Sequence, residues 1–335
     1  MKKLIYVGFS FSHHGEHTGY DQIRKYVSYE KIINCQKSFN LLQSFLKKRS
    51  IATRLYGKVF GGRLWWIEIK LIIISIFNHK GYNFHYIYGE NIYRYLGHFK
   101  YGNKITLTLH QPPAFYESTN QKKLKKALHR VDKIIVMSKD MESYFKKEFP
   151  NIDIKFIPHG VDTKYFKPNT PKHNQILMVG NWLRDFTFAS KVFKELENKL
   201  QNIQIKIITN KENHKFFIDN KVQCFHSISD NDLLALYQSS KLVFLPLKKF
   251  TANNAVLEAQ SCGCQVLIAT EKENFINEDD SNIRFIENNI EKAFLNISNI
   301  VTSWDRTTEE RNRKFIRNSL DWKIIGNSTE IFLKN

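Results

Sequence analysis

The sequence has few cysteines, and none of them is spaced as a metal ligand. Four are present: Cys35, Cys224, Cys262 and Cys264. No pair has the spacing of a zinc site, and the last two lie among residues of packing type. So few unpaired thiols are typical of a reducing compartment, and a cytoplasmic protein is therefore expected.

Histidine and aspartate clusters do not supply a metal site either. His13, His14 and His17 lie close together, but no cysteine or acidic cluster stands beside them to complete a coordination shell. A strand-end Asp-x-Asp motif is missing as well, since Asp279-Asp280 falls in a polar loop. We therefore expect neither a metal ion nor a cofactor.

Long hydrophobic runs are also missing. The apolar run Leu4–Gly8, which follows Met1-Lys2-Lys3, is too short for a signal peptide. Leu64–Phe77 is interrupted by Glu68 and Lys70 and is shorter than a bilayer-spanning helix. We expect no secretory leader and no membrane span.

Acidic residues are outnumbered by basic ones. The 335 residues include 51 Lys and Arg against 32 Asp and Glu, which gives a formal net charge of +19. Such an excess indicates an acidic partner. The length and the 42% apolar composition are enough for two domains with a core each.

What the chain does have is an alternation of short strand-like runs with helical patterns. The expected strands are Leu4–Val7, His85–Tyr88, Ile105–Leu109, Lys133–Met137, Ile154–Ile157, Gln175–Val179, Gln204–Ile208, Lys221–Phe225, Lys241–Leu245, Gln265–Ala269 and Ile283–Ile286. Helical spacing lies between them, as in Phe188–Leu200 and in Asp230–Ser239, which opens on a Ser229/Asp230 cap. This order predicts an α/β protein with parallel sheets covered by helices.

The polar segment with two prolines, Phe166–Asn174, is the expected link between two doubly wound domains facing across a cleft. The expected divisions are an N-terminal domain over residues 1–166, a linker over 167–174, a C-terminal domain over 175–315, and a helix over 316–335 that packs back toward the N-terminal domain. Ligands of such sheets bind beyond the carboxyl ends of the strands.

The stretch Thr251–Gly263 is the most informative one. Thr251 and Asn253 are good N-cap types, so the free backbone N–H groups at the start of the following helix would attract a phosphate. Glu258 lies one turn further on, where a carboxylate can accept hydrogen bonds from the two hydroxyls of a ribose. The alternative is an ordinary buried helix with one paired glutamate.

Four segments resemble the GT-B glycosyltransferases, specifically the large retaining group classed as family 4. They are Ile157–Pro168, Ile176–Gly180, Ser229–Tyr237, and Phe244–Leu247 followed by Thr251–Gly263. Their order and spacing match from about residue 100 to residue 270. The resemblance implies two Rossmann-like domains, retention of configuration and no metal.

The resemblance implies donor-binding roles in the second half. Glu258 aligns with the second acid of the family's Glu-x7-Glu motif and would bind the ribose, whereas Phe250 replaces the first acid. Thr251, Asn253 and Asn254 would bind sugar hydroxyls and diphosphate.

The loop after Gly180, where the family places an Arg and a Lys, has Arg184 as its diphosphate candidate and Phe186 at the Lys position. Lys248 and Lys249 are the cations nearest to the donor loop. The alternatives are an ion pair of Arg184 with Asp185 or a neighbouring residue, and plain solvated charge for the two lysines.

In the first half, the candidates follow strand ends. The family carries a His where His110 ends a predicted strand before Pro112-Pro113, and this His contacts the transferred sugar. Ser138 and Glu90 are expected on the acceptor side, as is Tyr20 in the loop after the first strand, where Gly19 lets the backbone approach the donor. This loop lacks the G-x-G-x-x-G spacing of a dinucleotide site. A purely structural histidine is the alternative for His110.

The basic charge is concentrated in Lys122–Arg130. Leu124, Ala127 and Leu128 share one helical face there, and the opposite face is almost wholly cationic. Such a face suits an anionic membrane surface or a lipid-diphosphate acceptor, although an ordinary amphipathic helix has the same pattern. No nucleic-acid motif accompanies the charge, so no nucleic acid is expected.

The sequence thus predicts a cytoplasmic, peripherally membrane-associated glycosyltransferase that uses a nucleoside diphosphate sugar and a glycan or lipid-linked acceptor. Three alternatives stay open at this stage: a catalytically lapsed homologue that binds nucleotide or glycan, a basic nucleic-acid-binding protein, and a sugar-nucleotide epimerase of the same fold. Replacement of the usual acid by Phe250 and of the usual cation by Phe186 favours the first of them.

Overall fold

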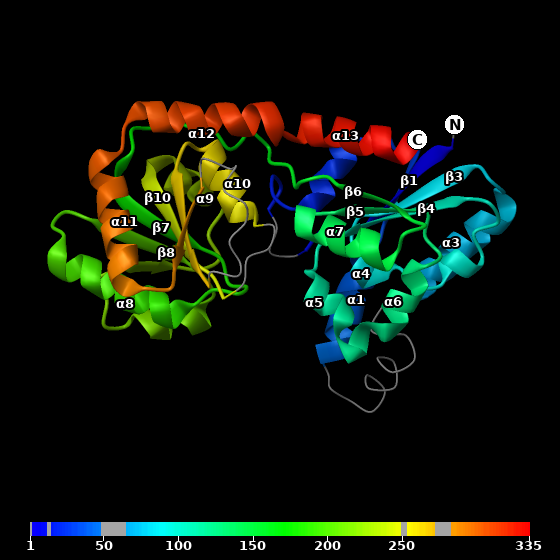
Figure 1. The fold of residues 1–335 in the computed structure, drawn as a ribbon, viewed down its shortest axis with the longest axis horizontal. Coiled ribbons are helices and arrows are strands. Elements are labelled where there is room, and N and C mark those ends of the chain that lie inside the picture. Colours follow the sequence, from blue (N-terminus) through cyan, green and yellow to red (C-terminus); the bar gives the residue numbers. More distant parts are fainter. Residues whose placement is uncertain (1, 12–14, 48–64, 249–252, 272–282) are drawn as a thin grey trace. The chain divides into compact units, whose positions relative to one another are not determined.

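The computed structural model describes residues 2–11, 15–47, 65–248, 253–271 and 283–335 (Figure 1). The chain forms two compact units. The N-terminal unit contains residues 1–14, 19–160 and 322–335, and the C-terminal unit contains residues 15–18 and 161–321. The chain therefore passes from one unit to the other four times, and its last helix belongs to the N-terminal unit.

The N-terminal unit is built on a parallel sheet. Its strands are β1 (Lys3–Gly8), β2 (Lys31–Asn34), β3 (Tyr82–Tyr86), β4 (Lys104–Leu109), β5 (Lys133–Val136) and β6 (Asp153–Phe156). They pair in the order β2-β1-β3-β4-β5-β6, and every pairing is parallel. The carboxyl ends of all six strands consequently meet at one edge of the sheet.

Helices cover this sheet. They are α1 (Gln36–Lys47), α3 (Trp65–Phe77), α4 (Gly89–Ile92), α5 (Pro113–Glu117), α6 (Lys122–Leu128), α7 (Lys139–Glu148) and α13 (Trp322–Lys334), with the short 3-10 helices η1 (Tyr20–Lys25), η2 (Leu96–His98) and η3 (Thr119–Gln121). Helix α13 is tied to the sheet by Asn83, whose Nδ2 donates to the Leu333 carbonyl at 2.8 Å, and by Lys133, whose Nζ donates to the Phe332 carbonyl at 2.7 Å.

The C-terminal unit has a second parallel sheet. Its strands are β7 (His173–Val179), β8 (Gln204–Ile208), β9 (Gln223–Phe225), β10 (Ser240–Pro246), β11 (Gln265–Thr270) and β12 (Ile283–Glu287). The order is β12-β11-β10-β7-β8-β9. Its helices are α8 (Phe186–Lys199), α9 (Asp230–Ser239), α10 (Asn254–Ser261), α11 (Ile290–Ser303) and α12 (Arg306–Ser319), with the 3-10 helix η4 (Lys211–Phe217).

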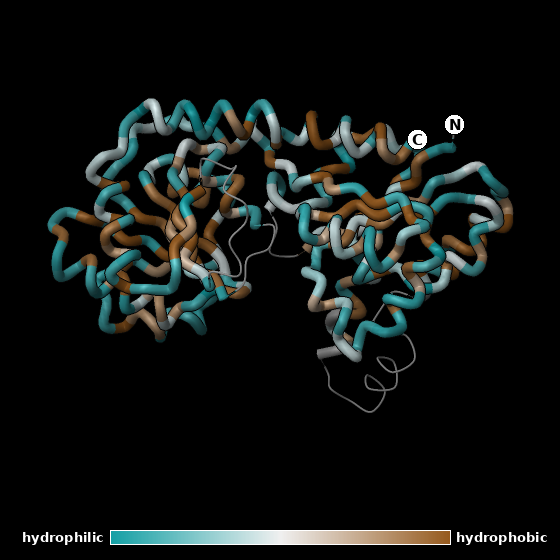
Figure 2. The backbone as a smooth tube through the Cα atoms, in the orientation of Figure 1, coloured by the Kyte–Doolittle hydropathy of each residue, from teal (hydrophilic) through white to brown (hydrophobic). Residues whose placement is uncertain are grey.

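Alternating strand residues fill two cores in this unit. Side chains such as Ile176, Met178 and Phe244 pack against α8 and α11. Their sequence neighbours, such as Leu177 and Leu245, pack against α9, α10 and α12 on the other face. Because both faces are covered, the middles of the central strands β7, β10 and β11 are apolar, and apolar segments are brown in Figure 2.

The prediction of an α/β protein with two doubly wound, Rossmann-like domains is confirmed. Every predicted strand is present, with ends shifted by at most a few residues. The sequence analysis missed β2, an edge strand in which only Ile33 is buried, so its hydrophobic pattern is weak. The predicted terminal helix over residues 316–335 corresponds to the end of α12 and to α13. No helix among the described residues is both long and apolar enough to cross a bilayer.

Candidate active site

Helix α10 begins where the sequence analysis places a phosphate-attracting helix. Asn253 is its N-cap, and its Oδ1 accepts a hydrogen bond from the Ala255 N–H at 3.1 Å. The first turn of α10 follows β10 in the chain. The N–H groups of this turn that the cap does not bind are directed outward. Asn254 is the first helical residue and is half-buried. Thr251 and Phe250 lie outside the described residues.

Glu258 is buried one turn further along α10. It is 5% exposed, and its Oε2 accepts a hydrogen bond from the Tyr237 hydroxyl at 3.0 Å. Burial raises the pKa of Glu258 to about 7; the Tyr237 hydrogen bond opposes this shift and the Asp230 charge adds to it. Tyr237, in α9, is a partner that the sequence analysis missed, because no sequence pattern links positions so far apart.

The raised pKa of Glu258 predicts a pH dependence of stability. The folded protein binds more protons than the unfolded chain between pH 4.5 and about 7, so stability falls as pH rises through that window. Between about pH 5 and about pH 8, we expect the unfolding free energy of wild type to fall by up to about 3 kcal/mol more than that of Glu258→Gln.

Denaturant unfolding at the two pH values measures this difference. The matched control is Glu310→Gln, whose side chain is 69% exposed and which should keep the wild-type profile. Equal pH profiles for wild type and Glu258→Gln would contradict the buried, protonatable state of Glu258.

Arg184 is a buried cation without a carboxylate partner among the described residues. The residue is 8% exposed. Its Nε donates to the Val179 carbonyl at 2.9 Å and its Nη1 to the Trp182 carbonyl at 3.1 Å, while Nη2 lies 3.5 Å from Asn253 Oδ1. Burial lowers the pKa of the guanidinium to about 10. A desolvated positive charge beside the start of α10 favours an anion there.

The predicted alternative of an ion pair between Arg184 and Asp185 does not occur. Asp185 instead caps α8, and its Oδ1 accepts the Phe188 N–H at 2.9 Å. Phe186, at the position where the resemblance expects a lysine, is buried and stacks on Phe216 at 5.6 Å between ring centroids. A packing residue thus occupies the second cation position.

Backbone contacts bring Arg184, Asn253 and the residues after β10 together. Arg184 and Leu247 form an isolated antiparallel bridge, and the Lys248 N–H donates to the Leu183 carbonyl at 2.9 Å. The Lys248 side chain is exposed. The loop after β7 and the segment after β10 therefore form one structure at the carboxyl edge of the sheet, which is where ligands of doubly wound domains bind.

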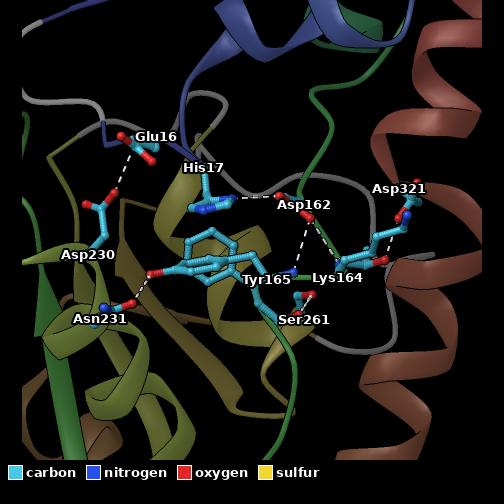
Figure 3. Close-up of polar contacts among 11 residues, drawn as sticks. Glu16, His17, Asp162, Lys164, Tyr165, Asp230, Asn231, Ser261 and Asp321 are labelled. Atoms are coloured by element: carbon cyan, nitrogen blue, oxygen red, sulfur yellow. Dashed lines mark hydrogen bonds and ion pairs between the residues drawn. The ribbon is translucent and has the colours of Figure 1, made fainter.

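The segment Gly15–Thr18 belongs to this unit although it comes early in the chain (Figure 3). The Glu16 N–H donates to Asp230 Oδ2 at 2.8 Å. A Cβ at Gly15 would lie 2.1 Å from Asp230 Oδ1, so a larger residue there would displace the Asp230 carboxylate. The Asp230 carboxylate that holds this segment is also the one that raises the pKa of Glu258.

Asp162 organises the other end of this segment (Figure 3). Its Oδ2 lies 2.8 Å from His17 Nδ1, and its Oδ1 accepts the N–H groups of Lys164 and Tyr165 at 3.1 Å each. The His17 ring stacks on Tyr165 at 3.6 Å between centroids. His17 thus contacts the Asp162 carboxylate and stacks on Tyr165.

In the N-terminal unit, the structure brings His110 and Glu90 together at the carboxyl edge of the sheet. The Glu90 Oε1 accepts the His110 backbone N–H at 3.1 Å and lies 3.4 Å from His110 Nδ1. The side chain of Glu90 is 3% exposed and that of His110 is 16% exposed. Neither ring nitrogen of His110 has a hydrogen-bond partner among the described residues. A histidine with an unused nitrogen beside a carboxylate can bind a hydroxyl or transfer a proton.

Tyr20, Ser138 and Gly19, the other candidates from the first half of the sequence, also belong to the N-terminal unit. Tyr20 is 1% exposed, and its ring makes an edge contact with the His110 ring at 4.9 Å between centroids. Burial raises the pKa of the Tyr20 hydroxyl to about 12. Ser138 caps α7, its Oγ accepting the Met141 N–H at 3.2 Å. Gly19 has φ of +92°, a left-handed conformation that favours glycine.

A cavity of about 540 Å³ lies in the C-terminal unit, away from Glu258. The first turns of α8 and α11 line it, including Asp185, Lys191 and Asn289. Asp185 caps α8 and Asn289 caps α11, so each side chain already accepts a hydrogen bond from a backbone N–H of its helix. The cavity is separate from the residues that the sequence analysis assigned to the donor.

No family model matches the chain, and no curated protein is similar to it in sequence. Solved structures are similar in fold. A glycosyltransferase from Rickettsia africae is 17% identical with a TM-score of 0.64, and the match covers 99% of this chain and 98% of that one. The trehalose-6-phosphate synthase OtsA is 9% identical with a TM-score of 0.70, covering 100% and 99%.

The Anabaena protein HepE, solved in complex with UDP, is 12% identical with a TM-score of 0.67, and the match covers 99% of both chains. The two parallel sheets, their strand orders and these full-length matches agree with the resemblance seen in the sequence. The chain has the GT-B glycosyltransferase fold.

Proposed function

We propose that the protein is a glycosyltransferase that moves a sugar from a nucleoside diphosphate sugar to a hydroxyl of a glycan or lipid-linked acceptor. The observation that supports this most directly is the buried Arg184 guanidinium, which no described carboxylate neutralises and which lies beside the capped start of α10. In a GT-B fold, such a cation suits the diphosphate that leaves during transfer. We propose retention of configuration and no metal requirement.

The donor would be bound by the C-terminal unit and by Gly19. Glu258 would accept hydrogen bonds from the ribose hydroxyls, while Arg184 and Lys248 would bind the diphosphate. Asn253, Asn254 and Thr251 would supply hydrogen bonds to sugar or phosphate. HepE and the pneumococcal O-GlcNAc transferase GtfA were both solved in complex with UDP, which makes UDP-sugars the first donors to test.

The transferred sugar and the acceptor would be bound by the N-terminal unit. His110 would contact the sugar through its unused Nε2, and Glu90 would orient the imidazole from the Nδ1 side. Ser138 can still donate its hydroxyl proton while it caps α7, so it is proposed to bind the acceptor. The buried Tyr20 ring would support His110 from the side.

We propose that the protein works in the cytoplasm at the inner face of the membrane, in the synthesis of a polysaccharide or lipopolysaccharide. Lys122, Lys123 and Lys126 are exposed on α6, and Lys125 lies 2.9 and 2.7 Å from Glu117 and Glu148. The exposed lysines would bind anionic headgroups or a lipid-diphosphate acceptor.

A catalytically lapsed, nucleotide-binding homologue is the second candidate, and the buried Phe186 favours it because this position offers no cation. Turnover separates the two functions. We would incubate the protein with UDP-, GDP- and ADP-sugars, with and without lipid-linked acceptors, and follow nucleotide release. Acceptor-stimulated release from one donor supports the transferase, whereas tight nucleotide binding without release supports the lapsed homologue. An isomerised donor without acceptor would identify an epimerase.

A further inference from the structure

Helix α3 in the N-terminal unit has an apolar outer face. Ile69, Ile73, Ile76 and Phe77 are 45%, 49%, 42% and 80% exposed. Successive members of this set are four, three and one residues apart in the sequence, which places them in one stripe along the helix. The opposite side, which includes Leu71, packs on the unit.

A buried carboxylate fixes which side of α3 faces outward. Glu68 is 1% exposed; it accepts the Tyr86 hydroxyl at 2.7 Å and the backbone N–H groups of Arg94 and Leu96 at 3.2 and 2.9 Å. A rotation of α3 that covered the apolar stripe would break these bonds and leave the acid buried without partners. The packing of α3 therefore keeps the apolar stripe exposed.

Lysines gather just beyond the end of this stripe. Burial and the Coulombic repulsion of Lys104, Lys100 and Lys80 lower the pKa of Lys2, and the Asp132 charge opposes this shift. The Nζ of Lys2 donates to the Lys80 carbonyl at 2.9 Å, and the Lys80 N–H donates to the Tyr101 carbonyl at 3.2 Å. The Lys100 Nζ forms an ion pair with Asp132 Oδ1 at 2.9 Å.

Exposed aromatic rings lie within this lysine group. Phe99 and Tyr101 are 45% and 44% exposed, and the Tyr101 ring stacks on His79 at 5.3 Å between centroids. Apolar, aromatic and cationic side chains in one patch are the composition that binds the headgroup and acyl boundary of an anionic bilayer.

We propose that the α3 stripe (Ile69, Ile73, Ile76 and Phe77), together with the neighbouring lysines Lys2, Lys80, Lys100 and Lys104, is a surface that inserts into a bilayer carrying anionic phospholipids. A second copy of the chain fits this patch less well, because a symmetric contact would bring its lysines against one another. The net charge of +19 also favours an anionic surface over self-association.

The position of this patch is compatible with turnover. Lys104 begins β4 and Leu109 ends it, so the lysines lie at the opposite edge of the sheet from His110. Docking on α3 leaves the carboxyl edge free. The inference rests on the proposed membrane association for its setting, but it uses none of the residues assigned to the nucleotide, so the two can fail separately.

Vesicle co-sedimentation of the full chain tests the proposal. The vesicles contain phosphatidylcholine alone or mixed with phosphatidylglycerol, and the key variant is Ile73→Ser/Phe77→Ser. Its matched control is Leu295→Ser/Ile218→Ser in the C-terminal unit, where the two side chains are 51% and 80% exposed. Thermal unfolding verifies that both variants fold, and nucleotide binding is measured in parallel.

We expect wild type and the control to bind the anionic vesicles, and the α3 variant to bind at least about tenfold more weakly. Lys80→Glu/Lys104→Glu should also weaken binding, most strongly at low salt. Three results would overturn the proposal: no vesicle binding by wild type, loss of binding only when Lys122, Lys123 and Lys126 are replaced, or an α3 variant that only dissociates a dimer.

Discussion

Replacement of His110 by alanine is expected to lower kcat for sugar transfer by at least about 100-fold. The imidazole is the one group at the carboxyl end of β4 that combines an unused nitrogen with a carboxylate contact, the 3.4 Å approach of Nδ1 to Glu90. The backbone N–H of His110 keeps its bond to Glu90 in the variant, so the fold should change little. Steady-state kinetics with the donor identified by nucleotide release measures the effect.

The exposed His98 provides the control, since His98→Ala should keep wild-type kcat. Glu90→Gln separates the roles further. If Glu90 only orients the ring, this variant lowers kcat less than His110→Ala does and shifts the pH profile of kcat. Equal kcat values for wild type and His110→Ala would remove His110 from the site and leave it as a packing residue.

Replacement of Trp322 by alanine is expected to destabilise the protein by about 3–5 kcal/mol. Trp322 is 1% exposed, and its ring lies 5.1 Å from His159, 5.7 Å from Tyr20 and 6.3 Å from Tyr26 between centroids. It opens α13 and is the largest fully buried side chain among the described residues of the N-terminal unit. Its loss leaves a cavity that these rings cannot fill.

Denaturant unfolding measures this loss. Trp182, which is 74% exposed, is the matched control, and Trp182→Ala should change the unfolding free energy by less than about 1 kcal/mol. A similarly small change for Trp322→Ala would contradict the packing of α13 on the N-terminal unit. The same ring explains why Gly160 is a glycine, because a Cβ there would lie 2.4 Å from the Trp322 ring.

The fold was predictable because its signals are local. Buried parallel strands are short apolar runs, and the residues that cap α9 and α10, Ser229 and Asn253, are visible in the sequence. The missed strand β2 has a single buried residue, Ile33, so its pattern does not differ from that of a loop. Glu68, which interrupts an apolar run in the sequence, is the acid that anchors α3.

The site was predictable only as a set of separate residues. The sequence analysis singled out Glu258, Arg184, His110 and Glu90, and their roles stay predictions. The partner of Glu258, Tyr237, is distant in sequence, whereas Arg184 bonds the backbone carbonyls of the nearby Val179 and Trp182. No residue type or spacing shows that a cation will be buried against carbonyl groups, because that arrangement arises from how the loops after β7 and β10 pack.

The measurement that tests the central proposal most directly is calorimetric titration of UDP, GDP, ADP and CMP into wild type and Glu258→Ala. We predict that one diphosphate binds wild type and that the variant binds it at least about tenfold more weakly, a loss of about 1.4 kcal/mol. Glu310→Ala, on the exposed side of α12, should bind as wild type does. If none of the four nucleotides binds wild type, or if Glu258→Ala binds with unchanged affinity, the donor site proposed around α10 is wrong.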